Sequence, residues 1–93
     1  MSNVGASDKQ EHYIKSSMQP IEVMQKLMSK EQFEGFLIGN IIKYSMRMNH
    51  KGALEADTTK RDQYYFWLQL ARKGKTIEPL KDVVPINFVY KGL

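Results

Sequence analysis

One stretch of the chain, residues 34–47, carries the pattern that most restricts the fold. Apolar side chains in and beside it recur every three or four residues, which is the spacing of one face of an α-helix. This face consists of Phe33, Leu37, Ile41, Tyr44 and Met48. At about 100° per residue, a second set falls in an adjoining stripe, made of Phe36, Asn40, Lys43 and Arg47. The sequence therefore predicts a helix that packs a core on one face. Its neighbouring stripe is either a solvated surface or part of a binding site.

The flanking segments predict two further helices, so the expected fold is a small all-α domain with one short and two long helices. Proline and glutamate in the first turn favour a short helix over residues 20–28. Ser29 is a suitable N-cap for the long helix, which we expect over residues 30–48. The other long helix is expected over residues 58–73, after a loop or short turn at 53–57.

Three features outside this pattern bear on packing. Four consecutive aromatic residues, 64–67, make the last helix apolar around its circumference, which predicts a position central to an oligomer. Residues 75–93 are rich in strand formers but interrupted by Pro85, so we expect an extended arm along the chain's own helices or a neighbouring subunit. Gly35 and Gly39 each cost about 1 kcal/mol relative to alanine in a helix. They favour close approach of another helix or a ligand.

Length and composition predict one domain with two appendages. A chain of 93 residues is near the size at which one core is barely sufficient, which again favours oligomerisation. Residues 1–11 read as a flexible polar leader, 12–74 as the helical domain and 75–93 as the arm. No apolar run approaches the roughly 20 residues of a membrane span, and the N-terminus lacks the apolar core of a signal peptide. We therefore expect a soluble, intracellular protein.

The titratable residues limit the possible chemistry. The absence of cysteine excludes disulfides and thiolate zinc sites, and two histidines are too few for a histidine metal cluster. The net charge of +4 is interleaved with acidic residues, which suits a small anion such as a nucleotide better than a duplex. No phosphate-binding loop of the Gly-x-x-x-x-Gly-Lys-Ser/Thr type occurs. Glu55 and Asp57 form either a carboxylate pair for Mg²⁺ or a solvated acidic loop.

The remaining candidates are side chains for binding a nucleotide. Tyr13 either docks the leader onto the body or stacks on a base, and Lys26 is either solvated or in contact with a phosphate. Lys43 and Arg47 are candidates for phosphate contacts, and Asn40 for a base edge.

An ordered set of these residues resembles a small phage domain family labelled nucleotide kinase-like or of unknown function. The set includes His12-Tyr13, Gly39-Asn40, Lys43-Tyr44, Arg47, Asp57, Lys60 and Tyr64. One branch of that family phosphorylates deoxynucleoside monophosphates. The pattern departs from that branch at Thr58, Arg61 and Tyr65, where leucine, alanine and leucine are usual.

The chain is also similar, in length and in the segments Gln-Pro-Ile-Glu and Glu-Gly-Phe-Leu-x-Gly-Asn-x-x-Lys-Tyr, to phage anti-CBASS sponge proteins. Those proteins are all-helical hexamers that sequester cyclic oligonucleotides between subunits without cleaving them. This resemblance implies ligand-binding roles for a set of side chains: His12, Tyr13, Lys26, Asn40, Lys43 and Arg47.

We therefore predict a non-enzymatic phage anti-defence protein, acting in the cytoplasm of the infected bacterial host. It would bind cyclic di- or trinucleotides as a homo-oligomer, with a hexamer implied by the resemblance, and would use no cofactor or metal. The alternative is a deoxynucleoside monophosphate kinase, with Asp57 or Glu55 on Mg²⁺ and Lys43 and Arg47 on phosphates. A third hypothesis is a protein–protein inhibitor that uses the aromatic helix and the arm.

Overall fold

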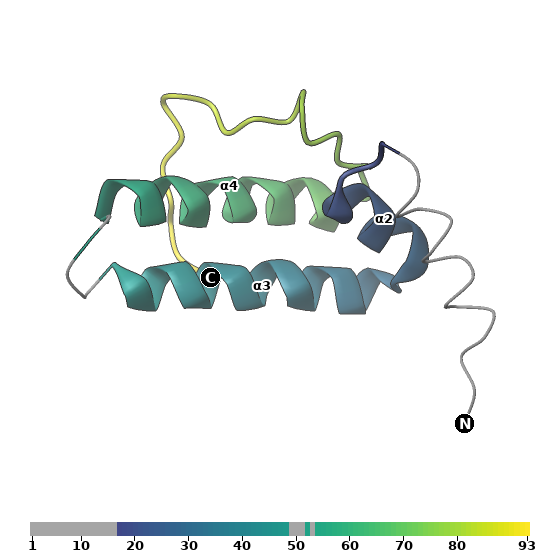
Figure 1. Ribbon diagram of the computed structural model, residues 1–93, viewed down its shortest axis with the longest axis horizontal. Helices are drawn as coiled ribbons and strands as arrows, with labels where there is room; N and C mark the ends of the chain where they lie inside the picture. Colours follow the sequence, from purple (N-terminus) through teal and green to yellow (C-terminus); the bar gives the residue numbers. More distant parts are fainter. Residues whose placement is uncertain (1–16, 49–51, 53) are drawn as a thin grey trace.

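The structure is a computed structural model that describes residues 17–48, 52 and 54–93. Three helices form the framework of these residues. They are α2 (Pro20–Leu27), α3 (Lys30–Arg47) and α4 (Leu54–Arg72), and no strand occurs among these residues. Figure 1 shows α3 and α4 side by side over most of their length, with α2 across one end. The prediction of an all-α fold with one short and two long helices is confirmed.

The first two helices begin where their sequences predict. The backbone N–H of Gln19 donates to the Glu22 carboxylate at 2.8 Å, at the start of α2. At the start of α3, the Ser29 hydroxyl accepts from the backbone N–H of Gln32 at 3.1 Å. The Gln32 side chain in turn accepts from the backbone N–H of Ser29 at 2.9 Å. These reciprocal bonds satisfy donors that the first helical turn leaves unpaired, which fixes the helix start.

The third predicted helix begins earlier than the sequence suggested. The predicted loop at 53–57 was wrong over most of its length, because α4 already starts at Leu54 and includes both Glu55 and Asp57. The acidic residues lie in the first turn of the helix, where they complement the helix dipole. This shift places Asp57 on a helix face that meets α3.

The core lies between α3 and α4. Leu37, Ile41 and Leu68 are fully buried there, and Ile77 closes one end from the arm. The apolar face predicted for residues 33–48 is therefore the face of α3 that packs against α4. The described residues contain no helix long and apolar enough to cross a membrane.

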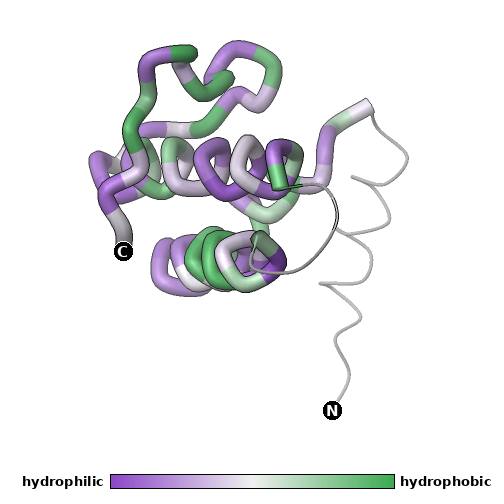
Figure 2. Tube along the Cα trace, turned by 90° about the vertical axis from the view of Figure 1, so that its left-hand side faces the viewer, coloured by the Kyte–Doolittle hydropathy of each residue, from purple (hydrophilic) through white to green (hydrophobic). Residues whose placement is uncertain are grey.

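The C-terminal segment is an extended arm that first covers the side of α4 opposite to α3, and its last residues then pass across α4 toward α3 (Figure 1). Figure 2 shows the arm, α4 and α3 as successive layers. The Trp67 ring nitrogen donates to the backbone oxygen of Asp82 at 2.7 Å. Tyr65 meets Tyr90 edge-on, with ring centroids 4.8 Å apart. The aromatic circumference of α4 is therefore covered by α3 and the arm of the same chain and does not by itself require a neighbouring subunit.

Two further sequence predictions concern residues or contacts beyond this description. The leader, 1–11, and the start of the helical domain at residue 12 lie outside the described residues. The structure contains one chain, so oligomerisation and the hexamer stay predictions.

Candidate functional site

The side chains with the most distinctive arrangement gather around the ring of Tyr44, near the C-terminal end of α3. The Lys43 ammonium lies 4.6 Å from the centroid of this ring. The Arg47 guanidinium carbon lies 5.6 Å and the Lys60 ammonium 5.5 Å from the same centroid. Cations at such distances are attracted by the negative face of an aromatic ring. One tyrosine therefore holds three positive groups together at the surface.

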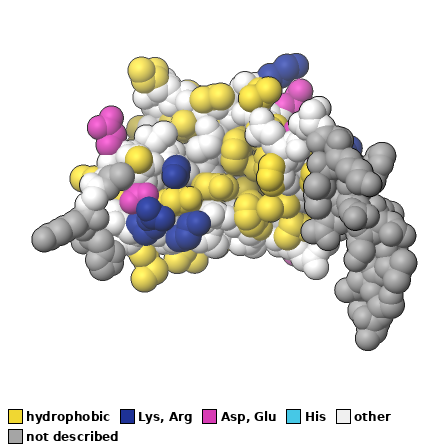
Figure 3. All heavy atoms as spheres, in the orientation of Figure 1, with side chains coloured by type: hydrophobic (Ala, Val, Ile, Leu, Met, Phe, Trp, Pro, Cys, Tyr) yellow, Lys and Arg dark blue, Asp and Glu magenta, His cyan; other side chains and the backbone are white. Residues whose placement is uncertain are grey.

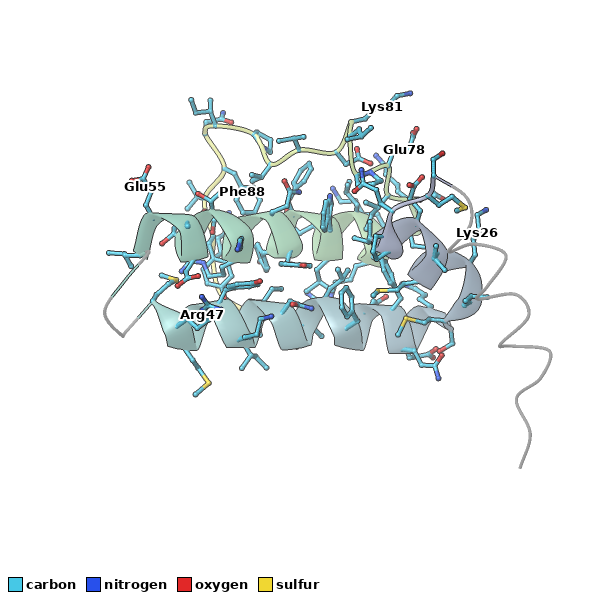
Figure 4. All side chains as sticks on the ribbon, in the orientation of Figure 1. Lys26, Arg47, Glu55, Glu78, Lys81 and Phe88 are labelled. Carbon is cyan, nitrogen blue, oxygen red and sulfur yellow. The ribbon has the colours of Figure 1, made fainter. Side chains whose placement is uncertain are left out.

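Two antiparallel helices bring these groups into one place. The last turns of α3 supply Lys43, Tyr44 and Arg47, and the first turns of α4 supply Asp57, Lys60 and Tyr64. We call these six residues the tyrosine–cation cluster. In Figure 3, dark blue side chains gather around a magenta one on the half of the α3–α4 pair that contains this cluster. Figure 4 shows the side chain of Arg47 directed into the space between the two helices.

Tyr64 supports the ring of Tyr44 from α4. The two rings are nearly parallel, at 11°, with centroids 5.9 Å apart. Trp67 and Phe36 meet the ring of Tyr64 edge-on at 5.5 and 6.1 Å. Burial, together with the nearby Tyr44 hydroxyl, raises the pKa of Tyr64 above its ordinary value of 10.0. The phenol of Tyr64 is protonated at neutral pH, as that of an ordinary tyrosine also is.

The cluster contains one acidic side chain, Asp57, which is 5% exposed. Its carboxylate lies 3.5 Å from the Nε atom of Arg47. Three cations and one carboxylate leave a net of two positive charges. The cation heads of Lys43 and Lys60 lie at an exposed surface, where an anion can reach them. The arrangement is therefore suited to binding a compact anion that carries about two negative charges.

The structure brings together only part of the predicted site. Lys43 and Arg47 both belong to the cluster. Asn40 lies about one turn before Lys43 on α3. Its amide donates to the backbone oxygen of Phe36 at 2.9 Å, which leaves its oxygen as an acceptor. Lys26 is exposed on α2 at the opposite end of the bundle from Arg47 (Figure 4). Lys26 therefore does not contribute to the cluster of its own chain.

Other predicted residues fall elsewhere. His12 and Tyr13 lie outside the described residues, so their predicted ligand contacts stay predictions. The alternative Mg²⁺ pair is not formed, because a spacing of two residues puts side chains on different sides of a helix. Asp57 faces Arg47, whereas Glu55 is exposed and points away from α3 (Figure 4). Within the described ranges, no three histidine or carboxylate side chains gather as a metal site.

Sequence reasoning did not assign Tyr44, Lys60 or Tyr64 to the site. The helical spacing placed Tyr44 on the apolar face, and it is in fact buried at the edge of that face. Lys60 and Tyr64 did appear in the ordered set that resembled the kinase-like family. That ordered set was the sequence signal that could have identified the cluster, because its members on α3 and α4 converge on the ring of Tyr44.

Comparisons with known proteins give this cluster a family context. Residues 7–65 match the model of a family described as a protein of unknown function (DUF3310). The chain belongs to this family. All six residues of the tyrosine–cation cluster lie within the matched range.

One curated relative has a described activity. Over 71 residues the chain is 40% identical to the nucleotide kinase gp1.7 of Escherichia phage T7. The match covers 72% of this chain and 35% of the relative, so the chain spans about a third of that protein's length. No solved structure matches the chain.

These similarities confirm part of the sequence prediction and correct another part. The relation to a phage nucleotide kinase-like family is confirmed, whereas the comparisons give no support to the sponge resemblance. The prediction that the protein is not an enzyme was wrong, because the relative with a described activity is a kinase. Both segments that carried the sponge resemblance lie within residues 7–65, the range that matches the family model.

Proposed function

We propose that the tyrosine–cation cluster binds the phosphate of a nucleoside monophosphate, and that this chain takes part in transferring a phosphoryl group to it. The observation that carries the proposal is the convergence of Lys43, Arg47 and Lys60 on the ring of Tyr44. The similarity to a phage nucleotide kinase supports the reaction class. Because the chain spans about a third of that relative, the complete reaction is itself part of the proposal.

The charge of the cluster favours a phosphate monoester over a diester. A monoester carries roughly −1.5 to −2 charges at pH 7, whereas each phosphodiester of a cyclic oligonucleotide carries one. The cluster has a net of two positive charges at one point. Hydrogen bonds from these cations to a phosphate are charge-assisted and therefore stronger than neutral ones. A terminal phosphate therefore fits the cluster better than a diester linkage.

The cluster has a defined task in such a reaction. An oxygen of the bound monophosphate attacks the terminal phosphorus of ATP, a new phosphorus–oxygen bond forms, and the bond to the bridging oxygen breaks to release ADP. Lys43 and Lys60 hold the acceptor phosphate and offset the negative charge that accumulates between the two nucleotides. We assign no Mg²⁺ ligand to Asp57, because it is paired with Arg47.

The test is phosphoryl transfer by the purified protein. The chain is incubated with ATP, Mg²⁺ and dTMP or dGMP, and the nucleoside diphosphate and ADP are separated by chromatography. Lys43→Ala and Lys60→Ala should each lower kcat/KM by about tenfold or more, since a charge-assisted hydrogen bond contributes about 1.5–3 kcal/mol. Lys81→Ala is the matched control, because Lys81 is 78% exposed on the arm.

Two results would count against the proposal. One is no conversion of either monophosphate by folded protein. The other is equal activity of the Lys43→Ala, Lys60→Ala and Lys81→Ala variants, because the cluster would then have no part in the reaction.

The cyclic di- and trinucleotides predicted from the sequence belong in the same panel. The protein is incubated with each one and denatured, and the released nucleotide is identified by chromatography. Intact recovery that depends on Tyr13 and Lys26, without turnover of monophosphates, would favour sequestration over catalysis. Dependence on Lys43 and Lys60 would place the phosphate at the tyrosine–cation cluster.

A further inference from the structure

Asp57 differs from every other charged side chain that the structure describes, because it alone is buried, at 5% exposure. Taking a carboxylate out of water is costly unless close partners offset the loss of hydration. The partner of Asp57 is Arg47, whose Nε atom lies 3.5 Å from the carboxylate. Strong hydrogen bonds between arginine and a carboxylate are shorter, at about 2.7–2.9 Å. The pair is thus longer than the geometry that best offsets a buried charge.

The contact with Asp57 leaves the outer end of Arg47 available to a ligand. The carboxylate approaches the guanidinium at Nε, and the two terminal nitrogens of Arg47 form no hydrogen bond to any residue that the structure describes. A guanidinium carries five N–H donors in one plane, so its terminal nitrogens can bind phosphate oxygens while Nε faces Asp57. The Arg47 side chain is 57% exposed, which keeps this edge accessible. A phosphate held there lies about 7 Å from the Asp57 carboxylate, one guanidinium group away.

We propose that Asp57 shifts the selectivity of the tyrosine–cation cluster from nucleoside diphosphates toward nucleoside monophosphates. The inference rests on the proposed function, because it concerns the same site. The three cations of the cluster attract an anion more strongly as its charge increases, and the repulsion from Asp57 increases in the same way. A diphosphate carries more negative charge than the monophosphate from which it is formed. Asp57 therefore opposes binding of the product more than binding of the substrate, which favours release of the product after transfer.

Burial makes Asp57 more effective in this role than an exposed carboxylate would be. Charges that water surrounds are screened, whereas buried charges are screened much less. Glu55 provides the comparison, because it lies in the same first turn of α4 but is exposed and points away from α3 (Figure 4). A phosphate at the cluster thus interacts with Asp57 across one guanidinium group and with Glu55 only through solvent.

Calorimetric titration of the full chain with dTMP and with dTDP, in the absence of ATP, tests the selectivity. Asp57→Asn keeps the size of the side chain and removes its charge. The ratio of the dissociation constant for dTMP to that for dTDP should rise at least about threefold in this variant, which is the factor for one unit of ligand charge at about 7 Å in a medium as polar as water. Glu55→Gln is the matched control, because it removes one charge from the same helical turn and should leave the ratio unchanged. A wild-type ratio in Asp57→Asn, or an equal rise in Glu55→Gln, overturns the proposal.

Asp57→Ala separates the effect of charge from that of hydrogen bonding, and it replaces Asp57→Asn if circular dichroism shows that the buried amide prevents folding. Alanine also removes the charge but offers no acceptor to Arg47, so the ratio should rise as much as with asparagine. A rise with alanine and none with asparagine would mean that Asp57 only holds Arg47 in place, and would overturn the charge mechanism.

The Lys43→Ala variant reports on the proposed function separately. If the wild type binds neither nucleotide, the proposed function itself fails. If Lys43→Ala weakens binding of both nucleotides while the Asp57 variants keep the wild-type ratio, the proposed phosphate site stands and only the selectivity inference fails.

Discussion

Replacing Tyr44 by leucine removes the ring around which the tyrosine–cation cluster is built. The ring is buried, with the cations of Lys43, Arg47 and Lys60 near it and the ring of Tyr64 stacked against it. Leucine keeps an apolar side chain at this position but offers no aromatic face. The matched control is Tyr44→Phe, which keeps the ring and loses only the hydroxyl.

The expected loss of stability follows from these contacts. A cation–ring contact contributes about 0.5 kcal/mol at an exposed site, and the three cations are all at the surface, which gives about 1.5 kcal/mol. The stacked ring pair adds about 1 kcal/mol. Tyr44→Leu should therefore lower the free energy of unfolding by about 2–3 kcal/mol. Tyr44→Phe should lower it by less than about 1 kcal/mol, as volume-conserving changes usually do.

Urea denaturation followed by circular dichroism measures this difference. The slope of the unfolding free energy against urea should be the same for both variants, so that the midpoints report stability alone. The leucine variant should also bind nucleoside monophosphates more weakly, because its lysines lose their common support. Equal stability of the leucine and phenylalanine variants would refute the role of the ring.

Three further predictions concern the core, the arm and pH. Leu37→Ala should lower the free energy of unfolding by about 2–5 kcal/mol, because Leu37 is fully buried; Leu80→Ala, at an 83% exposed position, should leave the melting temperature nearly unchanged. Gln63 bonds to two backbone groups of the arm, so Gln63→Ala should loosen the arm and shift the fluorescence of Trp67, the one tryptophan, to longer wavelength without changing helix content. An unchanged emission spectrum would contradict this contact. The raised pKa of Tyr64 means that the folded state holds the phenolic proton more tightly than the unfolded chain does. This contribution to stability is complete below pH 10 and is lost as the pH rises through the folded pKa. The melting temperature should thus fall more steeply above pH 10 in the wild type than in Tyr64→Phe, and parallel curves would argue against the shift.

The helical framework was largely predictable because its signals are local. The cap at Ser29 and the spacing of Leu37 and Ile41 act within a few residues of one another, so they can be recognised in a linear sequence. The start of α4 was misplaced because its first turn, apart from Asp57, is exposed and so shows no apolar spacing that continues the buried face of the helix. Asp57 of this turn pairs with Arg47 on another helix, a contact that the linear sequence does not reveal.

The sequence by itself determined that α3 carries an apolar face and, beside it, a stripe with Lys43 and Arg47. Only the tertiary structure decided what that stripe does. The antiparallel packing of α4 brings Lys60 and Tyr64 to Tyr44 and leaves Lys26 at the other end of the bundle. Spacing along a chain fixes which side chains share a helix face, whereas contacts between helices depend on how their buried faces fit together.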